Sequence, residues 1–514
     1  MQVSPTVVRA ILAAAFAVAA ALGVLHANRS WLLPGASSDS VQYLEAAESF
    51  ERDGTLSVPI APWAATDSVV PLRHYPPGVP LILAAGLRLG LRSDISALWV
   101  LALGAAASLG LAVWMIDAVA GPFGATLVGA LLMLNPVAIQ LHLALWSEPV
   151  FVSLILMLTW TMARQPRASW AHGILAALAL FTRYVGVAAT GAVVLWALIQ
   201  RGPVVRRLSA AAWAALPSVA ATVYWLWEPG GTRQVRALGY YPGILNDLAV
   251  LPSVLLRWFG GGLPRMGALL ALAASLALLS RGWRRAVMTG GVLGRLTVAA
   301  AVYSALHIGV VIVARVTADP AISLDGRILY PVLVLVTLGV VLGVSDALQR
   351  ARPITIIPLV VGLAAWPFAA ATEARGGLAI AQVQGRFYSD AGWVSDPVIW
   401  WLDNRSSPWP AVYSNEPALV RFHTGRAART LPRVGESLSA FADVLRQRPG
   451  PIVVALPLHP GDLSGVTWQQ CLDLEVAASS PRAIALVPRP HAGSGGPWHP
   501  LLPTCSVQHG GVDR

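Results

Sequence analysis

An acidic stretch near the N-terminus offers a carboxylate that could act as a catalytic base. Residues 37–56 read SSDSVQYLEAAESFERDGTL and directly follow a strongly apolar segment. Apolar residues recur there every third position, at Val41, Leu44, Ala47 and Phe50. This spacing predicts a helix over 40–53 with one apolar face, which could rest on a bilayer. Serines 37, 38 and 40 can cap that helix and place Asp39 near its N-terminus. The spacing alone favours a simpler role, in which Asp39 only caps the helix.

Further polar residues stand at the expected ends of other helices. The segment RHYPPGVP at 73–80 contains Arg73, His74 and Tyr75, and LWSEPVF at 145–151 contains Glu148. Arginine follows an apolar run in FTRYVG (Arg183) and precedes one in DGRILYP (Arg327). Singly, such arginines usually extend toward the membrane surface, and an acid beside proline usually begins a helix. Together on one predicted face, they form a constellation of one base and several cations.

The composition predicts that these residues are positioned by membrane-spanning helices. The chain has 514 residues, of which 56% are hydrophobic and 12% charged, and its mean hydropathy is +0.63. Soluble domains carry about 25% charged residues, so the chain is expected to be a polytopic membrane protein. The net charge of +11 comes entirely from arginine, because lysine is absent. Since the arginines lie between apolar runs, the expected partner is anionic lipid and not nucleic acid.

About eleven apolar windows have the length or character of a spanning helix. They are 7–25, 95–116, 122–141, 147–163, 170–183, 185–200, 209–227, 266–280, 297–314, 328–345 and 354–371. The segment 79–92 is too short to span and is expected to lie in the interface. Arginine is dense in the short loops 164–169, 201–208, 281–296 and 346–353, which favours a cytoplasmic N-terminus. This topology predicts a multi-pass protein of the cell inner (plasma) membrane, with Asp39 in a first outer loop, 26–94.

The hydrophobic spans end near residue 372, and residues 373–514 are expected to form a small α/β domain on the outer (periplasmic or extracellular) face. β-like runs occur at 411–415, 452–458 and 483–488, with a helical stretch at 436–447. Cys471 and Cys505 have no zinc-site spacing, and they could pair if the domain faces an oxidising compartment. The expected transmembrane domain is therefore 1–372.

These motifs resemble those of the GT-C superfamily of membrane glycosyltransferases. The resemblance lies in SSDSVQYLEAA, YPPGVPLILA, SEP, TRY and GRILYP, and in VYSNEPALVRFHTGR at 412–426. It is greatest for the branch of protein O-mannosyltransferases, lipid A aminoarabinose transferases and uncharacterised bacterial relatives. It implies a sugar donor carried on a polyprenyl phosphate, inversion at the anomeric carbon, and Asp39 as the base. Ser40 stands where the mannosyltransferases have a second acid, which leaves the acceptor open among lipid, glycan and protein.

Such a reaction needs a base for the acceptor hydroxyl and cations for the departing lipid phosphate. Arg183 and Arg327 are the main candidates for binding the donor phosphate, because a guanidinium group can bond two phosphate oxygens. Arg73 and His74 are weaker candidates for the same role. Tyr43, Tyr75 and Glu148 are assigned to substrate binding. Neither a cofactor nor a metal is required by this scheme, and a DxD metal motif and a Gly-rich phosphate loop are absent from the sequence.

Two other functions fit a membrane protein of this composition. A transporter or lipid flippase would favour charged or Gly/Pro-broken residues in mid-membrane and two similar halves. The sequence instead places its charged residues at the outer ends of the spans and has no internal repeat. A non-catalytic scaffold, whose outer domain binds glycan or protein, remains the third possibility.

Overall fold

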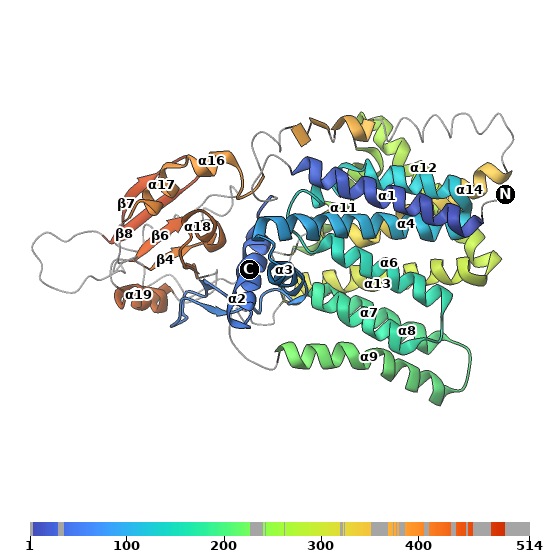
Figure 1. The fold of residues 1–514 in the computed structure, drawn as a ribbon, viewed down its shortest axis with the longest axis horizontal. Helices are drawn as coiled ribbons and strands as arrows, with labels where there is room; N and C mark the ends of the chain where they lie inside the picture. Colours follow the sequence, from blue (N-terminus) through green and yellow to red (C-terminus); the bar gives the residue numbers. More distant parts are fainter. Residues whose placement is uncertain are drawn as a thin grey trace, which may run out of the picture. The chain divides into compact units, whose positions relative to one another are not determined.

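The computed structural model (Figure 1) describes most of the chain, and its residues fall into two compact units. The described residues are 4–28, 35–226, 240–241, 243–261, 263–318, 322, 324–350, 369–373, 375–376, 378–379, 386–405, 411–432, 438–448, 451–455 and 474–488. Unit 1 comprises Met1–Pro34, Tyr75–Pro229 and Val235–Val383, and unit 2 contains Gly35–His74 and Gln384–Arg514.

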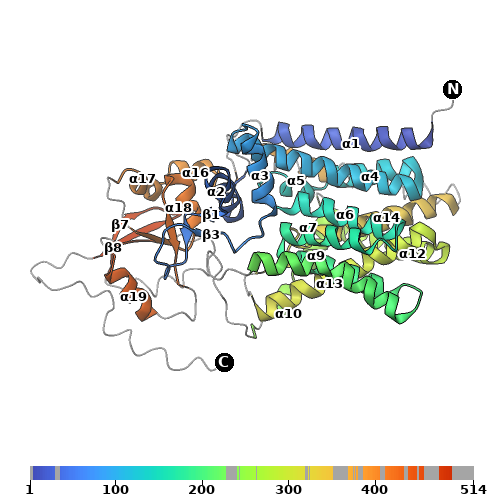
Figure 2. The same ribbon diagram turned by 60° about the horizontal axis from the view of Figure 1, so that its bottom comes forward.

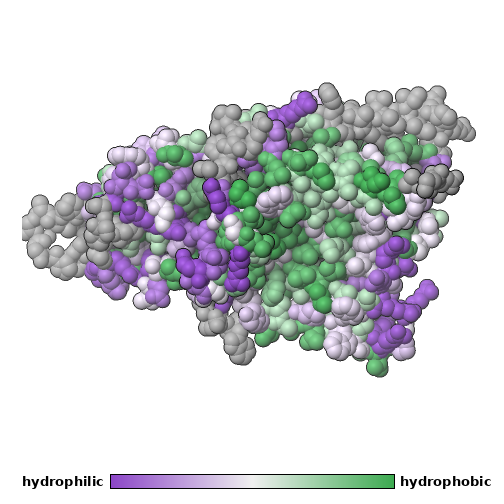
Figure 3. Space-filling view, in the orientation of Figure 1, coloured by the Kyte–Doolittle hydropathy of each residue, from purple (hydrophilic) through white to green (hydrophobic). Residues whose placement is uncertain are grey.

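Unit 1 is a bundle of apolar helices, which confirms the predicted class of polytopic helical membrane protein. Among the residues that the structure describes, six helices are long and apolar enough to cross a membrane. They are α1 (Pro5–Ala27), α4 (Ser93–Met133), α9 (Val204–Leu226), α12 (Arg265–Thr289), α13 (Gly291–Thr317) and α14 (Tyr330–Arg350). Helix α1 packs along α4, and apolar side chains cover much of the visible face of this unit (Figure 3).

The predicted number of eleven spans is not confirmed. Three of the predicted spans correspond to shorter helices, α6 (Glu148–Arg164), α7 (Ser169–Thr182) and α8 (Val187–Ile199), and the one-turn helix η1 (Tyr184–Gly186) precedes α8. The predicted span 354–371 lies mostly outside the described residues. The segment 79–92 contains α3 (Gly78–Arg88), and its position at the interface stays a prediction.

The predicted span 122–141 is interrupted. Its first part continues α4 beyond a kink, where Gly121 has φ 75° and Pro122 follows. The helix ends at Met133, and the short helix α5 (Pro136–Leu141) begins after Asn135. The Asn135 side chain accepts hydrogen bonds from the backbone N–H groups of Val137 and Ala138, at 3.0 and 3.2 Å. An N-cap followed by proline thus starts a new helix inside the apolar run.

Ion pairs between partly exposed arginines and buried aspartates link helices of unit 1. Arg9 Nε lies 2.7 Å from Asp117 Oδ2, which links α1 to α4. Arg281 on α12 pairs with Asp346 on α14 at 2.7 Å, and Arg285 adds a second contact at 3.3 Å. Two shorter helices, α10 (Ile244–Leu248) and α11 (Leu251–Gly260), complete the described part of this unit.

Unit 2 is built around a mixed sheet of six strands in the order β2-β5-β4-β6-β8-β7. The strands are β2 (Ile60–Ala61), β4 (Val412–Ser414), β5 (Ala428–Thr430), β6 (Ile452–Ala455), β7 (Leu474–Ser479) and β8 (Ile484–Pro488). Strands β2, β5, β4 and β6 run parallel, and β8 and β7 are antiparallel additions. The predicted strands at 411–415 and 483–488 are therefore confirmed, and so is the first part of 452–458, whose residues 456–458 lie outside the described residues.

Several helices accompany this sheet in unit 2 (Figure 2). Helix α19 (Leu438–Arg446), which was predicted at 436–447, buries Phe441 against Tyr413 of β4. The others are α2 (Ser38–Asp53), α16 (Ala391–Val394), α17 (Pro397–Asp403) and α18 (Pro417–Thr424). A two-stranded sheet pairs β1 (Ser57–Val58) with β3 (Val70–Pro71).

The structure divides the first loop differently from our prediction. We had assigned all of 26–94 to the transmembrane domain and begun the outer domain at residue 373. Residues Gly35–His74 belong to unit 2, and their strand β2 pairs with β5. Helix α2 packs on α18, and Val41 and Ala47 of its apolar face are buried in protein. Protein therefore covers Val41 and Ala47, whereas Leu44 and Phe50 are half-buried, and contact of this face with lipid stays a prediction.

Candidate functional site

Two predicted arginines meet one buried carboxylate in unit 1. Glu148 is the first residue of α6, and its side chain is 0% exposed. Arg183, in extended conformation between α7 and η1, forms an ion pair with Glu148 Oε1. Arg327, in the turn before α14, forms an ion pair with the same oxygen. Three segments that are far apart in sequence are thus joined by one carboxylate.

Neighbouring groups fix the direction of each guanidinium group. Arg183 Nη1 donates to Ser147 Oγ at 3.0 Å. The Arg327 guanidinium carbon lies 4.3 Å from the centre of the Trp146 ring, within the range of a cation–π contact. Asp325 accepts the backbone N–H groups of Arg327 and Ile328, both at 2.9 Å. Asp325 therefore caps the turn that carries Arg327.

A buried histidine, which the sequence analysis missed, also holds the Arg327 turn. The Nε2 atom of His307, on α13, lies 2.9 Å from the Ile328 carbonyl oxygen. Its Nδ1 atom lies 2.9 Å from the Tyr303 hydroxyl, one helical turn earlier. Both side chains are 0% exposed. A histidine inside an apolar span, four residues after a tyrosine, was the signal available in the sequence.

The resulting cluster has the chemistry of an anion site. Two guanidinium groups and one carboxylate leave one net positive charge. The arginine side chains are 19% and 25% exposed, whereas Glu148 is fully enclosed. Glu148 Oε2 is buried and makes no hydrogen bond with any residue that the structure describes. A buried carboxylate that orients two partly accessible guanidinium groups can direct their positive charge toward a phosphate.

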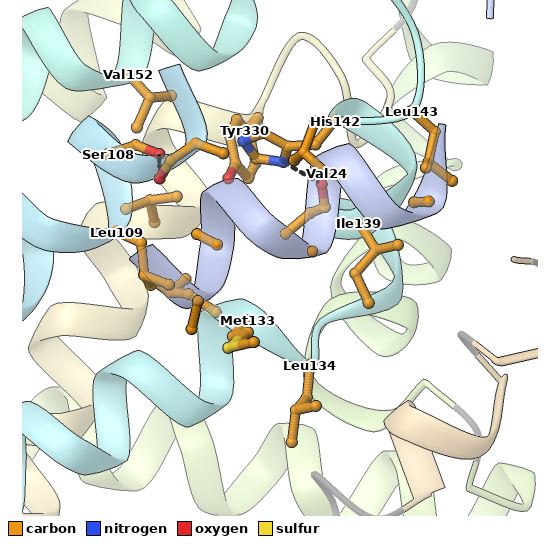
Figure 4. Close-up of a pocket in the computed structure, with 18 of the residues that line it drawn as sticks. Val24, Ser108, Leu109, Met133, Leu134, Ile139, His142, Leu143, Val152 and Tyr330 are labelled. Carbon is orange, nitrogen blue, oxygen red and sulfur yellow. Dashed lines mark hydrogen bonds between the residues drawn. The ribbon is translucent and has the colours of Figure 1, made fainter. Parts of the chain in front are cut away.

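An apolar cavity lies in the same unit, between α1, α4, α5 and α14 (Figure 4). Its volume is about 250 Å³, and Val24, Leu109 and Met133 are among the apolar side chains that line it. Two larger polar residues, His142 and Tyr330, also face it, with ring centres 6.2 Å apart. Tyr330 follows Arg327 by three residues, so the α14 turn connects the cavity with the arginine cluster.

Asp39 lies in unit 2, in the first turn of α2. The helix is capped by serines: the Ser37 N–H donates to Ser40 Oγ at 3.0 Å, and the two hydroxyl groups lie 3.2 Å apart. Asp39 is half-buried. Ser37 and Ser40 thus fill the capping role that had been the simpler explanation of Asp39.

The remaining predicted residues differ in their surroundings. Tyr43 is 1% exposed, which favours a core role over substrate contact. Arg73 and His74 are half-buried in unit 2, and Arg73 Nη1 donates to the Leu72 carbonyl at 3.3 Å. Tyr75 is half-buried in unit 1. A shared phosphate site for Arg73, His74 and the Arg183–Arg327 cluster stays a prediction.

The expectation that no metal is required also stays a prediction. Over the described ranges, no three His, Cys, Asp or Glu side chains gather as a metal site. Cys471 and Cys505 lie outside the residues that the structure describes, and so does their predicted pairing.

Comparison with known proteins reveals similarity at the level of fold. No family profile and no curated protein sequence matches the chain. The structure of ArnT from Cupriavidus metallidurans bound to undecaprenyl phosphate superposes with a TM-score of 0.55 at 15% identity, over 93% of this chain and 98% of that one. An Archaeoglobus fulgidus oligosaccharyltransferase, in complex with zinc and sulfate, gives 0.55 at 12% identity over 92% and 72% of the chains. Arabinofuranosyltransferase AftD from Mycobacteria gives 0.53 at 15% identity over 93% and 40%.

Proposed function

We propose that this chain, which has the fold of the GT-C membrane glycosyltransferases, transfers a sugar from a polyprenyl-phosphate donor to an acceptor hydroxyl group. The observation that carries the proposal is the pair of partly exposed arginines held by a buried glutamate. Such a pair suits a phosphate that gains negative charge as its bond to the sugar breaks.

The donor would place its phosphate on Arg183 and Arg327. Both guanidinium groups are partly exposed beside Glu148, so phosphate oxygens can approach them. The apolar cavity beside Tyr330 has the lining that an isoprenoid chain requires. The binding of undecaprenyl phosphate by ArnT, which shares the fold, supports this choice of donor.

Asp39 would act as general base in a single displacement. The acceptor oxygen attacks the anomeric carbon while its proton passes to the Asp39 carboxylate. The bond between the anomeric carbon and the phosphate oxygen breaks, and the polyprenyl phosphate leaves with the bonding electrons. Attack opposite the leaving group inverts the anomeric centre. Proton removal by a positioned carboxylate is worth roughly 10²–10⁴-fold in rate.

The reaction is proposed for the outer face of the inner (plasma) membrane. The density of arginine in the short predicted cytoplasmic loops supports this orientation. Unit 2, with its sheet and Asp39, would then lie in the periplasmic or extracellular space.

A direct test uses purified protein in lipid nanodiscs with a panel of polyprenyl-phosphate sugars. Transfer to an acceptor, or slow hydrolysis of one donor with inversion, is expected from wild-type protein but not from Asp39→Asn. A flippase would instead move a labelled donor across vesicles without cleaving it. Donor movement without cleavage across the whole panel would contradict the proposal.

A further inference from the structure

A short segment of the C-terminal region crosses the start of the helix that carries Asp39. Phe387 pairs with Ala36 in an isolated parallel bridge, and the Tyr388 N–H donates to the Ala36 carbonyl at 2.9 Å. The Ala36 N–H in turn donates to Ser389 Oγ at 3.2 Å. Phe387 has φ 54°, a conformation that a bulky residue adopts only where its surroundings impose it. The backbone before Asp39 is therefore held on both its N–H and C=O sides.

The Tyr388 side chain anchors this segment on α18. The residue is 7% exposed, and its hydroxyl group donates to the Glu416 carboxylate, at the N-terminus of α18. Burial first, and then the charges of Glu416 and Asp39, raise the pKa of Tyr388 well above its usual range. The hydroxyl therefore keeps its proton and remains a donor.

Tyr388 is itself fixed from a third side. His423 Nε2, on α18, lies 2.9 Å from the Tyr388 carbonyl oxygen. Burial lowers the pKa of His423, so the neutral ring is favoured and can donate to that carbonyl through Nε2. Glu416 is oriented by the Ser414 hydroxyl, which accepts its N–H at 3.0 Å. Tyr388 and Glu416 are therefore each held in place by a further hydrogen bond.

We propose that Tyr388 and Glu416 are positioning residues for Asp39. Tyr388 and Ser389 hold Ala36 by its C=O and N–H groups, and the bond from the Tyr388 hydroxyl to Glu416 anchors that segment on α18. Together these contacts fix the start of α2, and with it the direction of the Asp39 carboxylate. This inference rests on the proposed function of Asp39 as base. A base that is misplaced by about 1 Å can lose on the order of 100-fold in rate, so the support matters to turnover beyond its effect on stability.

The chain offers a matched control on the same pair of helices. Glu45 of α2 accepts from Arg421 of α18 at 2.7 and 3.0 Å. This ion pair also docks α2 on α18, but it lies nearly two helical turns from Asp39. If Tyr388 and Glu416 act only by docking the helix, loss of the Glu45 contact will have the same consequence for turnover.

The experiment compares Tyr388→Phe, Glu416→Ala, Glu416→Gln and Glu45→Gln in full-length protein. We expect Tyr388→Phe and Glu416→Ala to lower kcat about 10- to 100-fold, with KM for the donor within about twofold of wild type. Glu416→Gln keeps an acceptor for the tyrosine hydroxyl and should recover most of kcat. Glu45→Gln should lower the unfolding midpoint without a comparable loss of kcat. The proposal is overturned if Glu45→Gln loses as much kcat as Tyr388→Phe, or if the kcat of Glu416→Gln is no higher than that of Glu416→Ala.

Hydrogen exchange separates this inference from the proposed function. The amides of residues 38–42 should lose protection in Tyr388→Phe and keep it in Glu45→Gln, whether or not a transferase assay succeeds. Unchanged protection in Tyr388→Phe refutes the positioning role. A wild-type protein that transfers no sugar, or an Asp39→Asn variant with full turnover, refutes the transferase proposal, and the positioning role in catalysis falls with it.

Discussion

Replacing Glu148 by glutamine should destabilise unit 1, because one carboxylate balances two arginines. The side chain is 0% exposed, and its Oε1 atom pairs with both Arg183 and Arg327. Removal of one partner from a fully buried pair costs about 3–5 kcal/mol, since the remaining charge is left uncompensated. The arginines are 19% and 25% exposed, so water offsets part of this cost. Glutamine also retains an acceptor, and we therefore expect a loss of about 2–3 kcal/mol.

The assay is reversible unfolding of the purified protein by SDS in mixed micelles, followed by tryptophan fluorescence. Glu45→Gln is the matched control, because Glu45 and Arg421 form a pair with side chains 19% and 22% exposed. That more accessible single pair should contribute only about 1 kcal/mol. The double variant Glu148→Gln/Arg327→Gln should lose less free energy of unfolding than the two single variants lose in sum, as expected for residues in direct contact. A Glu148→Gln variant within about 0.5 kcal/mol of wild type would refute our reading that this carboxylate holds the arginines together.

Two further predictions concern the same cluster. Arg183→Lys and Arg327→Lys should each lower kcat/KM for the donor by about 10²–10³-fold, because an ammonium group cannot reproduce a forked contact with phosphate; full activity of both lysine variants in a transfer assay would contradict a phosphate site there. His307→Phe should lower the free energy of unfolding by about 1–3 kcal/mol, since the Ile328 carbonyl and the Tyr303 hydroxyl both lose a buried partner. It should also raise KM for the donor by displacing the Arg327 turn, and an unchanged KM would assign His307 to stability alone.

The class of fold could be predicted from sequence because it depends on local composition. Apolar windows of spanning length and period-two runs both leave a signal within a few residues. The predictions that failed concern longer-range or subtler signals. Strand β2 is only two residues long, Ile60–Ala61, and its partner β5 begins at Ala428. A strand of two residues is too short to show an alternating pattern of apolar and polar residues. The first loop was therefore assigned to the membrane domain only because it lies between apolar spans in the sequence.

The break inside 122–141 was present in the sequence as an Asn135-Pro136 pair, which is a turn signal that the apolar count outweighed. The convergence of Arg183, Arg327 and Glu148 was predictable only as a shared face, since ion pairing depends on how three distant segments pack. Glu416 lies in the quoted segment 412–426, but the sequence gave no sign that it or Tyr388 acts near Asp39. A tyrosine in a loop and an acid before proline are ordinary, and only their contacts near Asp39 distinguish them.

The most direct test of the account is the turnover of Asp39→Asn, measured beside wild type with an active polyprenyl-phosphate donor. Asparagine preserves the size of the side chain but cannot take up the proton of the substrate hydroxyl group. The hydrogen bonds between Ser37 and Ser40 should keep helix α2 folded in this variant. We expect a loss of about 10²–10⁴-fold in kcat, with unfolding and donor binding unchanged. Turnover equal to that of wild type would contradict the assignment of Asp39 as the base.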